Sequence, residues 1–478
     1  MGTMRLGHSL PAPSSGGDPD VAFRWPTGPW MLTILVLTTI GSAAFLGTLA
    51  NPMASVGWWG YAAWLIAAGV CLLAARSVTM VLAKGRPAPE EQPDDLFSDL
   101  GPPVVRRFRA RMGGWGAYIG AATQVIGHIA ATSAVVLLMG RTIFPGQATA
   151  SRAAAVAGIA ALAVARILVR EPRRGLTVLV VSAALVGLVW VGVHLQTVRP
   201  GTMHASQLAS RVSPDGFLEA TALLPLAFLP VLRMSVMLPG VRSVRRRQVL
   251  QRWVMPLTAL TAVALAAALG DAVGGVLPST DGTVLAQAVS DCPAWVRVTL
   301  LAVTLVLGAV FALILLDDSQ LVASRVLRDN AIRDIFAAPR GRRASTTGEA
   351  VTATAAAAGV AVAPGPQELI AFSAFCVIML FGTMHVAALR LSGDDRWRRR
   401  LMPMAGLVGS GLLGFYLPPE AILAGIVVVS LAVLVRSVFI AWSEPLAPDI
   451  VEGVGASASA ARRPEDAAGD LPADDGAR

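Results

Sequence analysis

The sequence predicts an all-α integral membrane protein with twelve transmembrane helices. Hydrophobic residues make up 55% of the 478-residue chain and charged residues only 14%, whereas a soluble domain carries nearer a quarter charged residues. The apolar residues gather in runs of about 20, the length that a helix needs to cross a bilayer. A water-soluble fold is therefore excluded. The net charge of +9 lies mostly in short loops between these runs, so it indicates membrane orientation rather than nucleic-acid binding.

We number the apolar segments 1 to 12 in chain order. They lie at about 29–50, 57–83, 113–140, 151–169, 174–196, 215–239, 251–274, 294–322, 348–363, 366–390, 400–417 and 419–442. Segment 9 gives the weakest signal, because it is short and consists mostly of alanine. Residues 1–28 are rich in Pro, Gly and Ser, and residues 443–478 are small, polar and acidic. We expect both stretches to be disordered, and the first has no signal-peptide pattern.

Basic residues alternate strongly between successive loops. The loops after segments 2, 4, 6, 8 and 10 hold 25 Lys and Arg residues, whereas those after odd-numbered segments hold four. Under the positive-inside rule, both termini are then cytoplasmic and the protein is a multi-pass protein of the cell membrane. One missed span would disrupt this alternation, so the charge count also supports twelve segments.

Loop lengths indicate an internal repeat. The longest cytoplasmic connections follow segments 2 and 8, and the connection between segments 6 and 7 is short. This favours a five-plus-five inverted repeat, with residues 29–196 against residues 215–390 and two further helices at 400–442. Segments 1 and 6 then become partners. Both are interrupted near their middle, by small residues at 41–47 and by two prolines within 224–230. Such paired interruptions point to a transporter binding site.

The order of these features resembles the amino acid–polyamine–organocation permeases. Segment 1 contains TIGSAAFLG, which looks like the first helix of that family, and MGGWGAYIGAATQVIGHIAA looks like its third helix. The stretch LLDDSQLVASRVLRDNAIRDIF is similar to the end of the eighth helix, and residues 368–442 follow the last three. The resemblance implies a LeuT-like fold and a secondary active transporter that moves amino acids or related small amines by alternating access. The substrate would lie between unwound segments 1 and 6, walled by segments 3 and 8.

The paired interruptions, the resemblance and two polar residues on one face of segment 3 give the candidate substrate-binding residues. They are Ile40, Gly41, Ser42, Ala43 and Phe45 in segment 1, Gln124 and His128 in segment 3, and Ala227, Phe228 and Leu229 in segment 6. The alternatives are a small-residue packing face in segment 1, core aromatic residues, and a histidine bonded to a neighbouring helix. Ala43 stands where the family has a second glycine, which weakens backbone recognition of a carboxylate. Segment 5 has no lysine, so the coupling ion is unknown, and a proton is one possibility.

Charged residues inside segments form a second candidate feature. Arg233 lies one turn beyond the break in segment 6, and an unpaired arginine there is costly. We expect it to pair with Asp317 or Asp318 of segment 8 as an inner gate; the alternative is that all three reach the interface. Arg76, Arg166 and Arg436 lie toward cytoplasmic ends, where snorkelling explains them.

Two other classes of function remain open. A non-transporting membrane scaffold or sensor would bind a partner or anionic lipid through the basic loops. A membrane-embedded enzyme is disfavoured, since no phosphate loop, metal motif or nucleophile elbow is present. The three cysteines show no metal or redox spacing, so no cofactor is expected. The expected partners are a small-molecule substrate and the lipid bilayer, with the oligomeric state undetermined.

The space between segments 1 and 6 distinguishes the transporter from the scaffold. A cavity between residues 40–46 and 225–230 would favour the transporter, whereas a space filled by apolar side chains would favour the scaffold.

Overall fold

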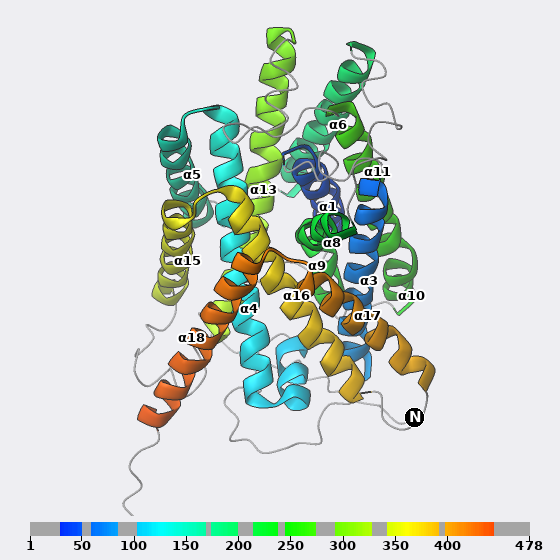
Figure 1. Ribbon diagram of the computed structural model, residues 1–478, viewed down its shortest axis with the longest axis vertical. Helices are drawn as coiled ribbons and strands as arrows, with labels where there is room; N and C mark the ends of the chain where they lie inside the picture. Colours follow the sequence, from blue (N-terminus) through cyan, green and yellow to red (C-terminus); the bar gives the residue numbers. More distant parts are fainter. Residues whose placement is uncertain are drawn as a thin grey trace, which may run out of the picture.

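The computed structural model describes a helical protein (Figure 1). The residues that it describes are 29–49, 59–84, 103–168, 174–198, 214–237, 244–273, 292–326, 342–391 and 397–443. The predicted disorder of residues 1–28, and of the tail beyond residue 443, lies outside these ranges. No β-strand occurs within them.

The helices coincide with the predicted apolar segments. Their bounds are α1 (Pro29–Leu49), α3 (Gly60–Lys84), α4 (Pro103–Ile143), α5 (Ala148–Leu168), α6 (Arg174–Val198), α8 (Pro214–Leu223), η2 (Leu224–Phe228), α9 (Leu229–Met237), α10 (Val244–Val249), η4 (Leu250–Val254), α11 (Met255–Val273), α13 (Ala294–Val326), α15 (Arg342–Val362), α16 (Pro366–Leu391), α17 (Trp397–Phe415) and α18 (Pro419–Ser443).

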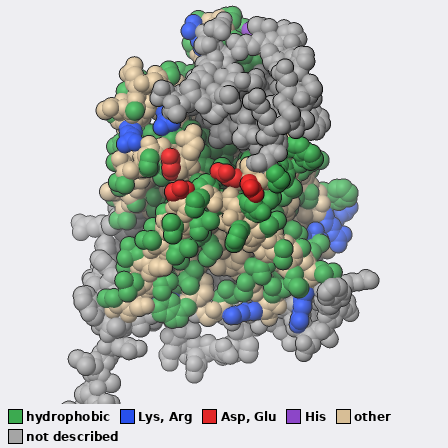
Figure 2. Space-filling view, in the orientation of Figure 1, with side chains coloured by type: hydrophobic (Ala, Val, Ile, Leu, Met, Phe, Trp, Pro, Cys, Tyr) green, Lys and Arg blue, Asp and Glu red, His purple; other side chains and the backbone are tan. Residues whose placement is uncertain are grey.

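Nine helical stretches in the described residues are long and apolar enough to cross a membrane. Three shorter apolar helices, at Leu32–Leu46, Ala350–Val362 and Arg400–Phe415, occupy the positions of segments 1, 9 and 11. Large apolar side chains also face outward, including Leu179 and Val186 on α6. Figure 2 shows a mostly hydrophobic face with Lys and Arg at its upper left, right and lower margins and a few Asp and Glu side chains in its upper part. The chain is therefore a multi-pass membrane protein; twelve spans and the orientation remain predictions.

The predicted loosening of segment 1 is wrong. Helix α1 is a continuous α-helix from Pro29 to Leu49 and runs without a break through Gly41 and Gly47. A methyl group added at Gly41 would lie 3.0 Å from a side-chain carbon of Leu307 in α13. The small residue at this position therefore permits close helix packing, which is the common use of small residues in membrane helices.

The predicted break of segment 6 is present. Helix α8 ends at Leu223, the next five residues form the tighter 3-10 helix η2, and α9 begins at Leu229. Pro225 lies in the first turn of η2, where its missing N–H is tolerated, and Pro230 lies in the first turn of α9. Two prolines at this spacing explain the local change from α to 3-10 geometry.

The core helices form two groups (Figure 1). The α1 group consists of α1, α3, the α8–η2–α9 unit and α11, which pack on one another. The α4 group consists of α4, α5, α13 and α15, which also pack on one another. Helix α1 and α13 join the two groups, and α16 packs on both α4 and α3. Helices α17 and α18 lie outside, against α16.

The packing partners follow the order expected for a five-plus-five repeat. Helix α1 packs on α11, and the unit five segments later, α8–η2–α9, packs on α3. Helix α4 packs on α16, and its counterpart α13 packs on α6. Exchanging each segment for its counterpart in the other repeat therefore turns each of these pairs into another observed pair. The repeat itself stays a prediction, which these pairings support.

Candidate functional site

The candidate site is the contact between α1 and the break in segment 6. The Ser42 hydroxyl donates a hydrogen bond of 2.7 Å to the backbone carbonyl of Ala227 in η2. Pro230 is the residue three positions beyond Ala227 and has no N–H, so it cannot satisfy this carbonyl in a 3-10 pattern. Ser42 thus supplies a donor where the proline removes one. Two of the predicted site residues are brought into direct contact here.

A second carbonyl of the break is also contacted by another helix. The Cys71 thiol of α3 lies 3.3 Å from the carbonyl oxygen of Phe228 and donates to it. Trp64, also on α3, packs edge-on against the Phe228 ring with 5.8 Å between the ring centroids. Neither Trp64 nor Cys71 was predicted from the sequence. Their spacing of seven residues places them on one face of α3, which is the signal that could have found them.

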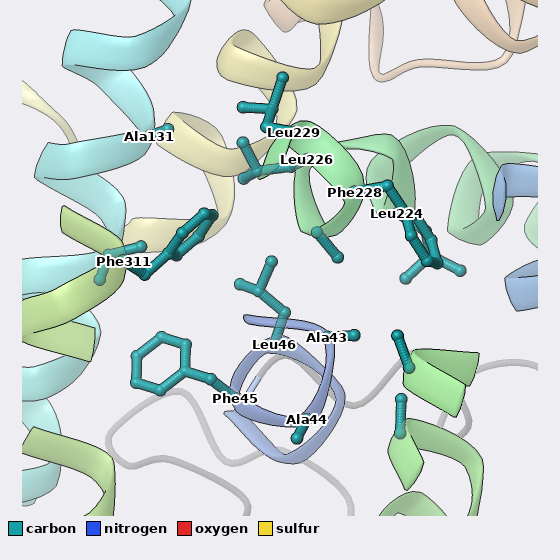
Figure 3. Packing of buried hydrophobic residues seen from close by; sticks show 14 of the residues in the cluster. Ala43, Ala44, Phe45, Leu46, Ala131, Leu224, Leu226, Phe228, Leu229 and Phe311 are labelled. Atoms are coloured by element: carbon teal, nitrogen blue, oxygen red, sulfur yellow. The ribbon is translucent and has the colours of Figure 1, made fainter. Parts of the chain in front are cut away.

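The space between α1 and the break is filled by apolar side chains. Ala43, Phe45, Leu226 and Phe228 are buried in the main hydrophobic core, together with Phe311 of α13. Figure 3 shows these residues converging from α1, the α8–η2–α9 unit and α13. Two surface grooves elsewhere are lined chiefly by α3 and α11, and neither includes residues 40–46 or 225–230. The site is therefore closed in this conformation.

His128 is the buried polar residue with the fewest partners at this site. Its side chain is 3% exposed, and neither ring nitrogen has a hydrogen-bond partner among the described residues. The imidazole is within electrostatic range of Arg233. Gln124, one turn earlier on α4, is half-buried. The alternative of a histidine bonded to a neighbouring helix therefore does not hold within the part of the chain that the structure describes.

Four charged residues form a buried ion cluster, which we define as Arg166, Arg233, Asp317 and Asp318. Arg233 of α9 pairs with Asp317 at 3.1 Å and with Asp318 at 3.0 Å. It also donates a 3.2 Å hydrogen bond to the Ile314 carbonyl. Arg166 of α5 pairs with the other oxygen of Asp317. The predicted pairing of Arg233 with the two aspartates is present; its role as a gate is not tested by this geometry.

The snorkelling interpretation is wrong for two arginines. Arg166 turns inward to Asp317 and so joins the ion cluster. The Arg436 side chain is 6% exposed, and its guanidinium lies 4.5 Å from the ring centroid of Trp115 and 4.8 Å from that of Tyr118. This arrangement gives the cation two aromatic faces instead of water. Arg76 is exposed, as snorkelling requires.

A second buried histidine lies outside the candidate site. The Nδ1 atom of His385 in α16 is 2.9 Å from the Ser77 hydroxyl of α3. A methyl group added at Gly406 of α17 would overlap the His385 ring. The ring thus packs between three helices, as expected for a structural histidine. The described residues contain no cluster of three or more potential metal ligands.

Replacing Ser42 by Ala tests the contact between α1 and the break. The change leaves the Ala227 carbonyl without this donor in a buried site, which should cost about 1–3 kcal/mol of stability. The midpoint of thermal unfolding in detergent should therefore fall. Ser437→Ala is the matched control, because Ser437 donates only to a carbonyl of its own helix in an exposed position. Equal midpoints for the two variants would contradict the importance of the bond.

Comparison with known proteins adds one further observation. The chain is 28% identical over 336 residues to an uncharacterized transporter of Mycobacterium tuberculosis strain H37Rv, covering 68% of this chain and 74% of the relative. Uncharacterized transporters of M. bovis and of M. tuberculosis strain CDC 1551 match to the same extent. The chain is similar to proteins named transporters. No family model matches it. These relatives support a transporter role and a non-enzymatic function in general terms, without a substrate.

Proposed function

We propose that the protein is a secondary active transporter of amino acids or related small amines. The observation that carries the proposal is the proline break in segment 6, whose carbonyl oxygens at Ala227 and Phe228 are held by side chains of α1 and α3. Irregular backbone at membrane depth is tolerated where it is buried in protein or lines a cavity. The transporter names of the relatives support the same reading.

The break offers acceptors for an ammonium group. Backbone carbonyls freed from helical bonding carry partial negative charge and take up cationic donors. In the closed conformation, the Ser42 hydroxyl and the Cys71 thiol occupy two of them. A substrate amine would replace these donors when α1 and α3 shift. Recognition of a carboxylate by the backbone amides of α1 is no longer part of the proposal, because α1 is continuous.

Alternating access would move the α1 group against the α4 group. The ion cluster links the two groups, since Arg233 belongs to the former and Arg166, Asp317 and Asp318 belong to the latter. Separation of α9 from α13 would break two ion pairs and open the predicted cytoplasmic side. The cluster therefore acts as the inner gate in this proposal, and His128 is within electrostatic range of its Arg233.

The second candidate is a non-transporting membrane scaffold or sensor. It is favoured by the filled space between α1 and the break, where buried apolar side chains take up the room that a substrate needs. The two candidates differ in one measurable respect, since only a transporter moves solute across a sealed membrane.

The test is uptake into proteoliposomes that contain the purified full chain. A panel of radiolabelled amino acids and polyamines is offered with and without a proton gradient, and protein-free liposomes are the control. We expect time-dependent accumulation of at least one amino acid or amine, reduced in the Ser42→Ala variant and retained in Ser437→Ala. Absence of uptake and of binding for the whole panel would remove the amino-acid proposal and leave the scaffold.

A further inference from the structure

The ion cluster is neutral only while the two helix groups are together. It contains two arginines and two aspartates, and each of its side chains is at most 17% exposed. Asp317 uses one oxygen for Arg166 and the other for Arg233, whereas Asp318 pairs with Arg233 through one oxygen. If α9 moves away, Asp317 therefore keeps its ion pair with Arg166, whereas Asp318 loses its ion pair with Arg233.

Movement of α9 leaves an unbalanced charge behind. Arg233 departs with the α1 group, while Arg166, Asp317 and Asp318 stay on α5 and α13 of the α4 group. Arg166 can neutralise one carboxylate, Asp317, to which it is already paired. Asp318 is then a carboxylate in a largely apolar setting without its cation, which is strongly unfavourable. Uptake of one proton from the water that enters removes the charge.

The groups that face Asp318 are consistent with this role. Arg233 approaches it from α9, Arg166 from α5, and Asp317 is its neighbour on α13. His128 of α4 is within electrostatic range of Arg233. Helices α1, α6 and α15 also pack on α13. The described side chains of α1 and α15 include no charged or titratable group. The titratable side chain among the described residues of α6 is His194, which lies against Trp295 at the opposite end of α13. Among these charged neighbours, Arg233 is the one that forms an ion pair with Asp318.

We infer that Asp318 is a proton-binding site whose protonation is linked to the separation of α9 from α13. The carboxylate takes one proton from water as Arg233 leaves and returns it as the ion pair re-forms. Mildly acidic conditions then favour the open gate, because the neutral carboxyl group no longer attracts Arg233. The inference rests on the proposed alternating movement, and it names the proton as the ion that this site binds.

Infrared spectroscopy of the full chain in proteoliposomes tests the site without a substrate. On lowering the pH from alkaline to mildly acidic, the wild type should gain a carbonyl-stretch band of a buried protonated carboxyl group. Asp318→Asn should lack this band, and Glu420→Gln, which neutralises an exposed carboxylate in the first turn of α18, should retain it. Arg233→Gln should show the band already at neutral pH, because it removes the cation as gate opening does. A wild-type difference spectrum identical to that of Asp318→Asn would overturn the inference.

A labelling experiment tests the link to opening. Ser235 on α9 is fully buried two residues beyond Arg233. In a Ser235→Cys background at one fixed pH, a polar maleimide should label the protein several-fold faster with Asp318→Asn than with Asp318 intact or with Glu420→Gln. Equal rates would overturn the link. If no substrate of the panel is taken up while the infrared band and the labelling difference appear, the transport proposal is wrong and the proton site stands. If a substrate is taken up while the band and the labelling difference are absent, transport stands and the proton site is wrong.

Discussion

Asp317→Asn is expected to destabilise the folded protein by about 3–5 kcal/mol, because it removes the charge of the buried carboxylate with which Arg166 and Arg233 both pair. Asp317 is the residue that both Arg166 and Arg233 contact. The amide keeps the shape of the side chain, so the loss reports on charge rather than on packing. Thermal unfolding of the purified protein in detergent measures the effect, and uptake of any substrate that the panel identifies should be lost as well.

A charge-balanced variant separates this effect from simple damage to the site. In the double variant Arg166→Met/Asp317→Asn, one arginine and one aspartate are removed together and the Arg233–Asp318 pair remains. Replacing a buried ion pair by neutral groups is often tolerated far better than breaking it. The double variant should therefore unfold at a higher temperature than Asp317→Asn alone. A double variant that is the less stable of the two would contradict the charge argument.

Gly127→Ala should also destabilise the folded protein, because it forces α4 and α16 apart. The added methyl carbon would lie 2.7 Å from the Cβ atom of Cys376, and the Ser373 hydroxyl bonds the Gly127 carbonyl in the same contact. Overpacking of a tight core costs about 1–3 kcal/mol. Thermal unfolding in detergent should register this loss, and His128, the next residue, should be displaced with it.

Two further variants make this prediction specific. Gly382→Ala on α16 adds the same methyl group where no atom lies within 4 Å, so its midpoint should match or exceed that of the wild type. Cys376→Gly removes the atom that meets the new methyl group, so Gly127→Ala/Cys376→Gly should recover much of the loss. A Gly382→Ala variant as unstable as Gly127→Ala would show that the contact is not the cause.

Most helix positions could be predicted because the bilayer imposes a length and a polarity on each segment. Apolar runs between basic loops marked the position of every long helix in the described residues, including the alanine-rich Arg342–Val362. The break at Pro225 and Pro230 was also predictable, since proline changes local backbone bonding wherever it occurs. The pairing of Arg233 followed from the cost of an isolated charge in the membrane.

The errors concern residues whose role depends on what faces them. A glycine such as Gly41 can either loosen a helix or allow another helix to pack closely. The Leu307 side chain lies against Gly41, so its role here is close packing. Arg166 and Arg436 have the sequence context of snorkelling residues, but their partners lie far away in the chain, at Asp317 and at Trp115 with Tyr118. Segment position fixes the depth of such a side chain, whereas only the packing of the helices fixes its direction.

The 3-10 turn between α8 and α9 has a mechanical consequence. A continuous helix transmits a tilt from one end to the other, as a rigid rod does. Here the rod is interrupted at Leu224–Phe228, with a proline at the start of each part. The break therefore provides a hinge between the half that carries Arg233 and the half that begins at Pro214, and both halves pack on α3. In the proposed transporter, such a hinge would let one side of the bilayer open while the other side stays sealed, which prevents a continuous leak.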